Sequence, residues 1–182
     1  SGKGGLQSVQ DGRRWKTALL AAVPALFVRA LADELRRAAG RRPVDCLGRR
    51  TGPLVPCRLN VLSDLAWERL APALFDMAGL RFYDYSKRTG RRVPASYHLT
   101  MSANERHADS ELRDLAGTYG TNVAVVFDTA RGAALPATYA GVRVVDGDLS
   151  DSRWADEVGV IVGLRAKGAA VGDRSGFVRA VG

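Results

Sequence analysis

The sequence contains little cysteine or histidine, with two residues of each type among 182. Cys46 and Cys57 are too few for a disulfide scaffold, so a reducing, cytoplasmic setting is expected. A zinc site that adds His98 and His107 to these thiols lacks the short-spaced ligand pairs that zinc sites use. Long apolar runs are missing too, because the best candidate, TALLAAVPALFV, has only 12 residues and cannot span a bilayer. These shortages argue against disulfide-rich, zinc-binding and membrane-spanning proteins.

Several catalytic and cofactor motifs are also absent. There is no Gly-x-Ser-x-Gly elbow, His-Glu-x-x-His helix or Cys-x-x-Cys pair, so hydrolase triads and zinc proteases are unsupported. The GKGG near the start follows no strand and lacks the spacing of a P-loop. No Gly-x-Gly-x-x-Gly follows the first predicted strand, which disfavours a dinucleotide-binding Rossmann fold. The chain does not begin with Met, and we expect it to be a trimmed fragment.

Positive charge is abundant and unevenly distributed. The net charge is +8, and residues 1–60 hold 12 Lys and Arg against 4 Asp and Glu, whereas residues 61–182 hold 15 of each sign. A second basic patch, KRTGRR, lies at 87–92 within the balanced part. Clustered arginine favours a polyanionic partner such as nucleic acid. The alternative is a set of solvated surface arginines with no partner.

Hydrophobic periodicity predicts alternating helices and strands along most of the chain. We expect helices over 13–22, 24–39, 65–79 and 103–120. We expect strands over 57–64, 80–87, 96–102, 121–128, 142–148 and 159–167. The length fits a single α/β domain over 1–182. Its parts are a helical lead at 1–40, with 1–12 irregular, a repeated β–α core at 57–167 and a loose tail at 168–182.

Strands separated by helices predict a mostly parallel, six-stranded sheet with right-handed crossovers. A partial (β/α) barrel and an open doubly wound sheet both satisfy this pattern. Buried parallel strands are usually apolar on both faces, yet two of the predicted strands alternate polar with apolar residues. The polar positions of CRLNVLSD and YHLTMS are Arg58, Asn60, Asp64, His98, Thr100 and Ser102. We favour the partial barrel, because its inner wall would line a ligand cavity with these side chains.

Polar residues at the carboxyl ends of the strands form the candidate site, since ligands of such folds bind there. Asp84, Asp146 and Asp148 are the predicted catalytic residues, because carboxylates act as acids or bases and bind divalent cations. His98 joins them because imidazole titrates near neutral pH. An Asp-Gly turn at 146–148 and a structural role for His98 are the alternatives.

The predicted substrate-binding residues are aromatic, cationic or polar. Two tyrosines and a Lys/Arg run share the segment FYDYSKRTGRR, a combination that stacks bases and holds phosphates in single-stranded nucleic acid. Two further cations leave the last strand in GLRAKG, a natural phosphate position in barrels. The full set is Arg58, Asn60, Tyr83, Tyr85, Lys87, Arg165 and Lys167. Asp64 and Ser102 also end predicted strands, but each directly precedes a predicted helix and fits an N-cap.

The motifs SGKGGLQSVQ, RLNVLSDLAWE, FYDYSK, YHLTMS, NVAVVF, VVDGDLSDSRW and GVIVGLRAKG, in this order, resemble an uncharacterised family encoded by bacteriophages, especially those of actinobacteria. The resemblance covers nearly the whole chain but names no activity. It implies a radical-type partial barrel and a cysteine-rich lead, resembling a metal-cluster loop, before the GKGG region. This chain starts after that lead, so an Fe–S cluster is implied only with an upstream cysteine-rich segment.

Our preferred hypothesis is a phage-type enzyme that acts on a nucleotide or a nucleic-acid base. Its target base would have to leave a duplex stack or be presented single-stranded. One alternative is a non-catalytic nucleic-acid-binding protein that uses the basic first third and the KRTGRR segment. Another is a radical-type enzyme that lacks its cluster loop. The substrate, the metal and the oligomeric state stay open at this point.

Overall fold

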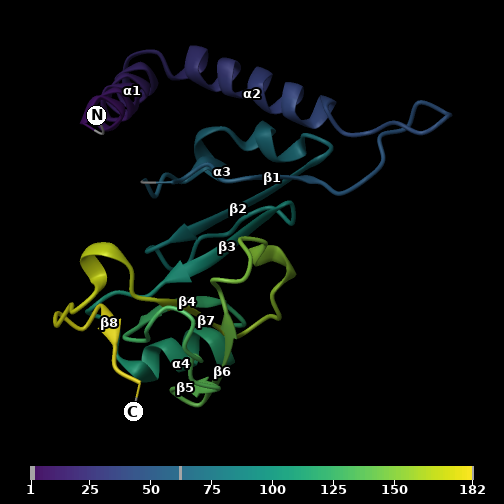
Figure 1. Cartoon of the computed structure of the whole chain (residues 1–182). Coiled ribbons are helices and arrows are strands. Elements are labelled where there is room, and N and C mark those ends of the chain that lie inside the picture. The colour runs from purple at the N-terminus through teal and green to yellow at the C-terminus, as the bar shows by residue number, and fades with distance from the viewer. Residues whose placement is uncertain (1–2, 62, 182) are drawn as a thin grey trace. The chain divides into compact units, whose positions relative to one another are not determined.

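The computed structural model of the chain describes residues 3–61 and 63–181 (Figure 1). The chain divides into two compact units. Unit 1 comprises Ser1–Val55 and Ala71–Leu80, and unit 2 comprises Pro56–Leu70 and Arg81–Gly182. The single domain inferred from length stays a prediction.

Unit 1 is mainly helical. Helix α1 spans Lys3–Ala22 and packs on α2, which spans Pro24–Gly40. The prediction for α2 is confirmed: Pro24 lies in the first turn, where its missing N–H breaks no helical bond. The expectation that residues 1–12 are irregular is wrong from Lys3 onward, because propagating a helix through single glycines costs only about 1 kcal/mol each.

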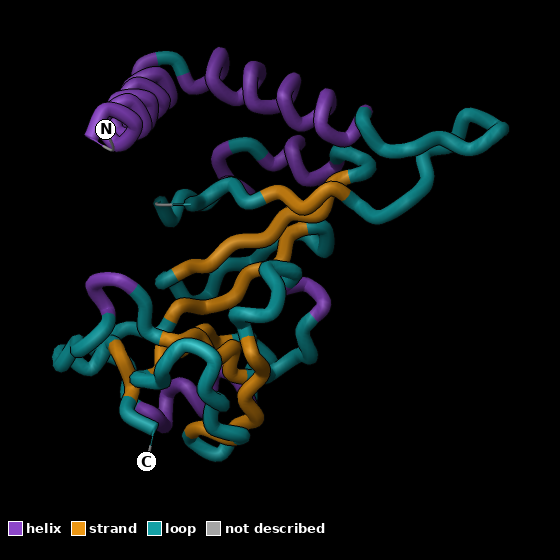
Figure 2. Tube along the Cα trace, in the orientation of Figure 1, coloured by secondary structure: helices purple, strands orange, loops and turns teal. Residues whose placement is uncertain are grey.

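Most strands belong to unit 2 and form one mostly parallel sheet, which confirms the predicted α/β class. Their order is β1-β2-β3-β4-β7-β6-β5, and β8 pairs with β4 (Figure 2). The strands are β1 (Val55–Cys57), β2 (Leu80–Ser86), β3 (Tyr97–Ser102), β4 (Val123–Phe127), β5 (Thr138–Tyr139), β6 (Val142–Asp146), β7 (Ile161–Arg165) and β8 (Val178–Arg179). β5 runs antiparallel to β6. The sheet is not closed across the described strands, and the barrel stays a prediction.

The core of unit 2 forms where helix α4 (Asp109–Gly117) packs on the apolar strand β4. Leu112 and Val125 are fully buried in this cluster. The neighbouring strand β7 approaches closely at Gly163, where a Cβ atom would lie 2.8 Å from a Val144 methyl group. Continuous apolar strands, with a glycine where β7 meets the Val144 side chain of β6, therefore form the centre of the sheet.

The strand predicted over 57–64 is wrong beyond Cys57, because the side chain of Asn60 competes with strand hydrogen bonds. Its Oδ1 accepts from the backbone N–H of Leu65 at 3.0 Å, and its Nδ2 donates to the carbonyl of the same residue at 3.0 Å. These bonds fold the segment after β1 into a compact irregular loop.

Both long helices predicted in the core are shorter than expected. The one over 65–79 is broken into α3 (Trp67–Leu70) and the 3-10 helix η1 (Pro72–Asp76), because Pro72 disfavours helical geometry at the residue before it. The one over 103–120 is reduced to α4, since Asn104 and the following residues form a side-chain-bonded turn.

Two short strands were missed. β5 pairs with β6, and β8 lies in the tail that was predicted to be loose. The tail also holds the 3-10 helix η3 (Gly168–Ala170), and the loop after β6 holds η2 (Arg153–Ala155). Strands of two residues carry too little periodicity for a sequence pattern to reveal them. None of the helices in the described ranges has an apolar stretch long enough to cross a bilayer.

Candidate functional site

A buried hydrogen-bond cluster joins the loop after β1 to strand β2. The Asp84 carboxylate is 0% exposed and accepts from the Asn60 backbone N–H at 2.8 Å, from Asn60 Nδ2 at 3.3 Å and from the Tyr97 hydroxyl at 2.8 Å. Asn60 Oδ1 in turn accepts from Trp67 Nε1 at 3.1 Å. Asp84 and Asn60 therefore position the loop, and the catalytic role predicted for Asp84 has no open path to a ligand here.

Burial raises the pKa of Asp84, although the hydrogen bonds from Tyr97 and Asn60 oppose that rise. Burial and the neighbouring Asp84 carboxylate also raise the pKa of Tyr97. The phenol therefore stays protonated at neutral pH and remains a hydrogen-bond donor to Asp84.

A second buried cluster fixes the KRTGRR segment to unit 2. The Arg91 guanidinium donates to both Glu68 oxygens, at 3.1 and 2.6 Å, and to Asp64 Oδ1 at 3.0 Å. Arg91 and Glu68 are only 5% and 6% exposed. Asp64 also accepts from Ser86 Oγ at 2.8 Å and from the backbone N–H of Lys87 at 2.8 Å. Asp64 thus anchors a loop, and the helix N-cap expected for it is wrong, because α3 begins only at Trp67.

A pocket of about 350 Å³ opens at the carboxyl ends of β2 and β3. The Arg58 guanidinium lies over the Tyr85 ring, 4.9 Å from its centroid. The exposed Lys87 follows β2 directly, and Ser102 is the last residue of β3. The lining residues are Arg58, Asn60, Val61, Ser63, Asp64, Tyr85, Lys87 and Ser102. The structure therefore brings four predicted substrate-binding residues together, and it places Ser102 in a pocket wall, ahead of any helix.

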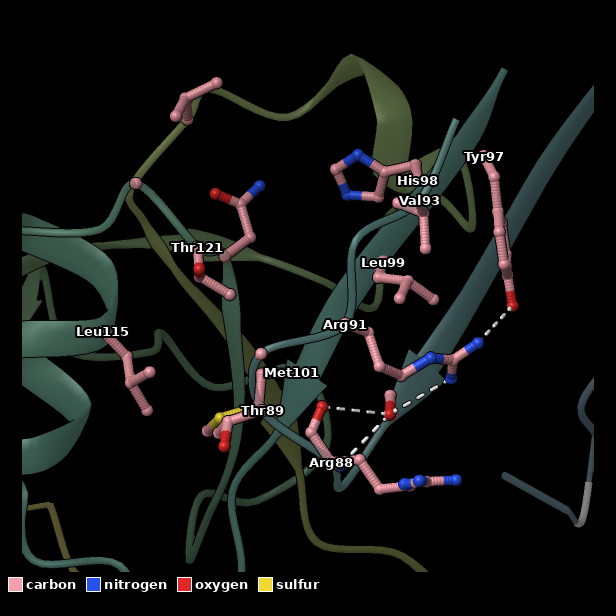
Figure 3. Close-up of a pocket in the computed structure, with 15 residues that line it drawn as sticks. Arg88, Thr89, Arg91, Val93, Tyr97, His98, Leu99, Met101, Leu115 and Thr121 are labelled. Carbon is pink, nitrogen blue, oxygen red and sulfur yellow. Dashed lines mark hydrogen bonds between the residues drawn. The ribbon is translucent and has the colours of Figure 1, made fainter. Parts of the chain in front are cut away.

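A separate cavity of about 330 Å³ lies between β3, the loop at 86–93 and the segment after α4. Figure 3 shows its apolar side chains Leu99, Met101 and Leu115, with Arg91 extending toward the Tyr97 hydroxyl. Among the predicted site residues, His98 lines this cavity and none of the others does.

The predicted catalytic residue His98 belongs to the polar face of β3. Burial lowers the pKa of His98, and the nearby Arg81 and Arg153 guanidinium groups lower it further, so the imidazole is neutral at pH 7. Its Nε2 lies 3.3 Å from the hydroxyl of Thr100, which is fully buried. His98 and Ser102 on this face are half-buried and line separate cavities, whereas Thr100 lines neither. The continuous cavity wall predicted from the alternation of YHLTMS is therefore not formed by these residues.

Four further predicted residues form a third cluster at the ends of β6 and β7, whereas the predicted binding residue Tyr83 lines neither cavity. Arg165 donates to both Asp146 oxygens at 3.0 and 2.9 Å and to Asp148 at 3.0 Å, and Lys167 donates to Asp148 at 2.7 Å. Two carboxylates and two cations thus balance each other, whereas the sequence suggested separate catalytic and phosphate-binding roles. Nowhere in the described part of the chain do three acidic, histidine or cysteine side chains gather as metal ligands do.

The family model described as Gene product 88 matches residues 1–181. The chain belongs to the Gene product 88 family. No curated protein and no solved structure matches it. The Gene product 88 match agrees with the resemblance to a phage-type family drawn from the order of the motifs, and it leaves the radical-type barrel and the activity open.

Acid titration of this Gene product 88 chain tests the third cluster. The hydrogen bond from Arg165 lowers the pKa of Asp146, and hydrogen bonds from Lys167 and Arg165 outweigh burial to lower that of Asp148. Since both values fall below the unfolded value, this stabilisation is full above that value and is lost as the pH falls through the folded ones. We expect Arg165→Gln to raise both values in carboxyl ¹³C NMR titrations. Arg143→Gln, which removes an exposed pair with Glu157, should leave them unchanged.

Sequence reasoning missed three buried charged residues in this Gene product 88 chain. Glu68 was assigned to a helix and Arg91 to a basic patch for a polyanionic partner, yet their side chains form a buried, two-bonded ion pair. Arg153 is 1% exposed and pairs with Asp156 at 3.2 Å. Only Arg91 carried a signal, since it lies in the basic segment that the composition singled out. The burial of the other two depends on contacts that no local pattern records.

Proposed function

We propose that this chain binds a nucleotide, or one nucleotide of a nucleic acid, in the pocket at the carboxyl ends of β2 and β3. One observation carries the proposal: Arg58 and Lys87 line the same pocket as the Tyr85 ring. A cation beside an aromatic ring suits a ligand that joins a phosphate to a planar base. The position also agrees with the general site of ligands in parallel sheets.

The electrostatics of the pocket support an anionic ligand. Lys87 is exposed and the Arg58 side chain is 33% exposed, so both cations can reach a phosphate. The Asp64 carboxylate also lines the pocket, but it accepts hydrogen bonds from Arg91, Ser86 and the Lys87 backbone. Arg91 also pairs with Glu68, and Arg58 lies 3.9 Å from the buried Asp84 carboxylate. The exposed Lys87 is therefore the cation that the pocket offers most freely to a phosphate.

Catalysis on the bound base requires a group that reaches it. Asp84 is buried beneath the pocket, and Asp146 and Asp148 line neither cavity. Asp64 is the carboxylate of the pocket wall, so a base-modifying reaction in this pocket would depend on it. DNA modification and radical-type chemistry in a partial barrel would each require reactive groups in addition to a binding pocket. Binding is therefore the function that the geometry supports best.

Isothermal titration calorimetry of nucleoside monophosphates, with inorganic phosphate as a reference, tests the proposal. We expect Arg58→Gln and Lys87→Gln each to weaken binding about tenfold, because each removes a charge-assisted hydrogen bond to phosphate. Affinity should also fall as the salt concentration rises. Arg92→Gln is the matched control, since Arg92 is exposed on the same loop and does not line the pocket. Equal affinities in all three variants, or no binding of any monophosphate, would contradict the proposal.

A further inference from the structure

Two tyrosines form an aromatic strip along one face of β2, and one of them lines the pocket. Tyr83 and Tyr85 alternate with buried residues and are themselves half-buried on the same face of the strand. Two positions on one face of a strand lie about 6.6 Å apart. Tyr85 lines the pocket, and Tyr83 lies one step further from it along the strand. The Tyr85 ring in the pocket is therefore the first of two aromatic rings on this face, and the Tyr83 ring is the second.

A third aromatic residue borders this strip. The Trp154 ring, from η2, contacts the Tyr83 ring edge-on, with the centroids 5.3 Å apart and the planes at 60°. On the neighbouring strand β3, His98 pairs with Tyr83 and Thr100 pairs with Tyr85 in register. Figure 1 shows β2 and β3 side by side. Aromatic side chains on adjacent positions of a sheet face are what proteins use to stack successive bases.

Positive charge accompanies the strip along its length. Arg58 covers Tyr85, Lys87 follows at one end of β2, and Arg81 lies on the same face at the other. Arg153 is buried nearby in η2, which packs against β3. The opposing carboxylates are Asp151 near both tyrosines, Asp84 near Tyr83 and Asp156 near Tyr85. Arg58 lies 3.9 Å from Asp84, and Arg153 lies 3.2 Å from Asp156. Arg81 and Lys87, one at each end of β2, are therefore the cations that this face offers to a polyanionic backbone.

We propose that single-stranded nucleic acid lies along this face, with one base in the pocket at Tyr85 and the next base against Tyr83 and Trp154. The inference rests on the proposed function and extends it from a nucleotide to a strand. An extended strand exposes its bases and presents a phosphate at each step, whereas a duplex buries its bases in the stack. The strip thus selects single strands over duplexes, without reading a sequence.

Binding of a single-stranded DNA hexamer, a duplex of the same sequence and a nucleoside monophosphate tests this inference. We expect the hexamer to bind at least about tenfold more tightly than the monophosphate or the duplex, because it engages a second stacking ring. Tyr83→Leu should weaken hexamer binding about tenfold and leave monophosphate binding unchanged, while Tyr85→Leu should weaken both. Tyr119→Leu, at an exposed tyrosine that lines neither cavity, is the matched control.

Further variants and ligands distinguish a loss of base stacking from effects on folding or on charge. Tyr83→Phe keeps the ring and should bind the hexamer like the unaltered chain, so a loss seen only in Tyr83→Leu is a loss of stacking. The hexamer should also quench the fluorescence of Trp154, and Trp154→Phe should abolish that quenching. Equal affinity for hexamer and monophosphate overturns the inference while the proposed function stands. A poly-glutamate peptide that binds as tightly as the hexamer also overturns it, and failure of every monophosphate to bind removes the proposed function itself.

Discussion

Replacing Arg91 by methionine is expected to lower the free energy of unfolding by about 3 kcal/mol. The substitution keeps much of the apolar stem but leaves Glu68, which is 6% exposed, without the guanidinium that donates to both of its oxygens. An unpaired buried charge is far more costly than a missing surface pair. Urea unfolding followed by circular dichroism measures the effect directly.

The matched control for this substitution is Arg92→Met on the same loop. Arg92 is exposed, and substitution of an exposed residue is usually worth less than about 0.5 kcal/mol. A second variant, Glu68→Gln combined with Arg91→Met, removes the stranded charge and should recover part of the loss. If Arg91→Met and Arg92→Met unfold at the same urea concentration, the buried network does not stabilise the chain as the geometry implies.

The fixed position of Arg91 also bears on the pocket. The same guanidinium holds Asp64, which accepts from the backbone N–H of Lys87. Loss of Arg91 should therefore release the Lys87 backbone as well as destabilise the fold. Nucleotide affinity measured on the folded fraction of Arg91→Met should fall, although Arg91 does not line the pocket.

Substitution of Asp84 by alanine is expected to destabilise the chain by about 3 kcal/mol at neutral pH. It leaves two buried donors without their acceptor, the Asn60 backbone N–H and the Tyr97 hydroxyl, and it removes one of the two acceptors of Asn60 Nδ2. Each unsatisfied buried group costs about 1 kcal/mol or more. Asp114→Ala, at an exposed position of α4, should change stability by less than about 0.5 kcal/mol.

The pH dependence of that loss follows from the raised pKa of Asp84. A carboxyl whose folded pKa lies above its unfolded value contributes stability that is full below the unfolded value and is lost as the pH rises through the folded one. The destabilisation by Asp84→Ala should therefore grow as the pH falls from 7 toward 4. A difference between the two proteins that stays constant with pH would mean that the buried carboxyl titrates normally.

Asp84→Ala also distinguishes a structural role of Asp84 from a catalytic one. The sequence placed Asp84 at the end of a strand with other carboxylates and so predicted a catalytic group. In the structure its oxygens position the loop that carries Arg58 and Asn60. A variant that unfolds earlier and also binds nucleotides more weakly when folded supports the positioning role.

The strands and helices that were predicted well are those whose signal is local. β2, β3 and β4 follow from period-two alternation or a continuous apolar run, and α2 follows from its apolar face and Pro24. Two of the errors, at 57–66 and 103–108, fall where Asn60 and Asn104 side chains bond to the backbone. Such hydrogen bonds depend on the loop geometry that they create, so no periodic pattern in the sequence predicts them.

The sequence likewise predicted some features of the candidate site and missed others. The sequence showed that cations and aromatics follow β2, and the pocket holds Arg58, Tyr85 and Lys87 as expected. It could not show that Arg165 and Lys167 neutralise the Asp146 and Asp148 carboxylates. Residues of opposite charge at two strand ends either bind a ligand or form ion pairs with each other. The amino-acid sequence looks the same in both cases.

Residue type and local spacing are enough to predict the α/β class, the mostly parallel sheet, the basic character and the polar strand ends. Which charges are buried, which pair and which face a pocket depends on how the chain packs. Charge pairing acts over the few ångströms between side chains that the chain order separates by many residues, as Arg91 and Glu68 are. That distance exists only once the strands and loops have packed.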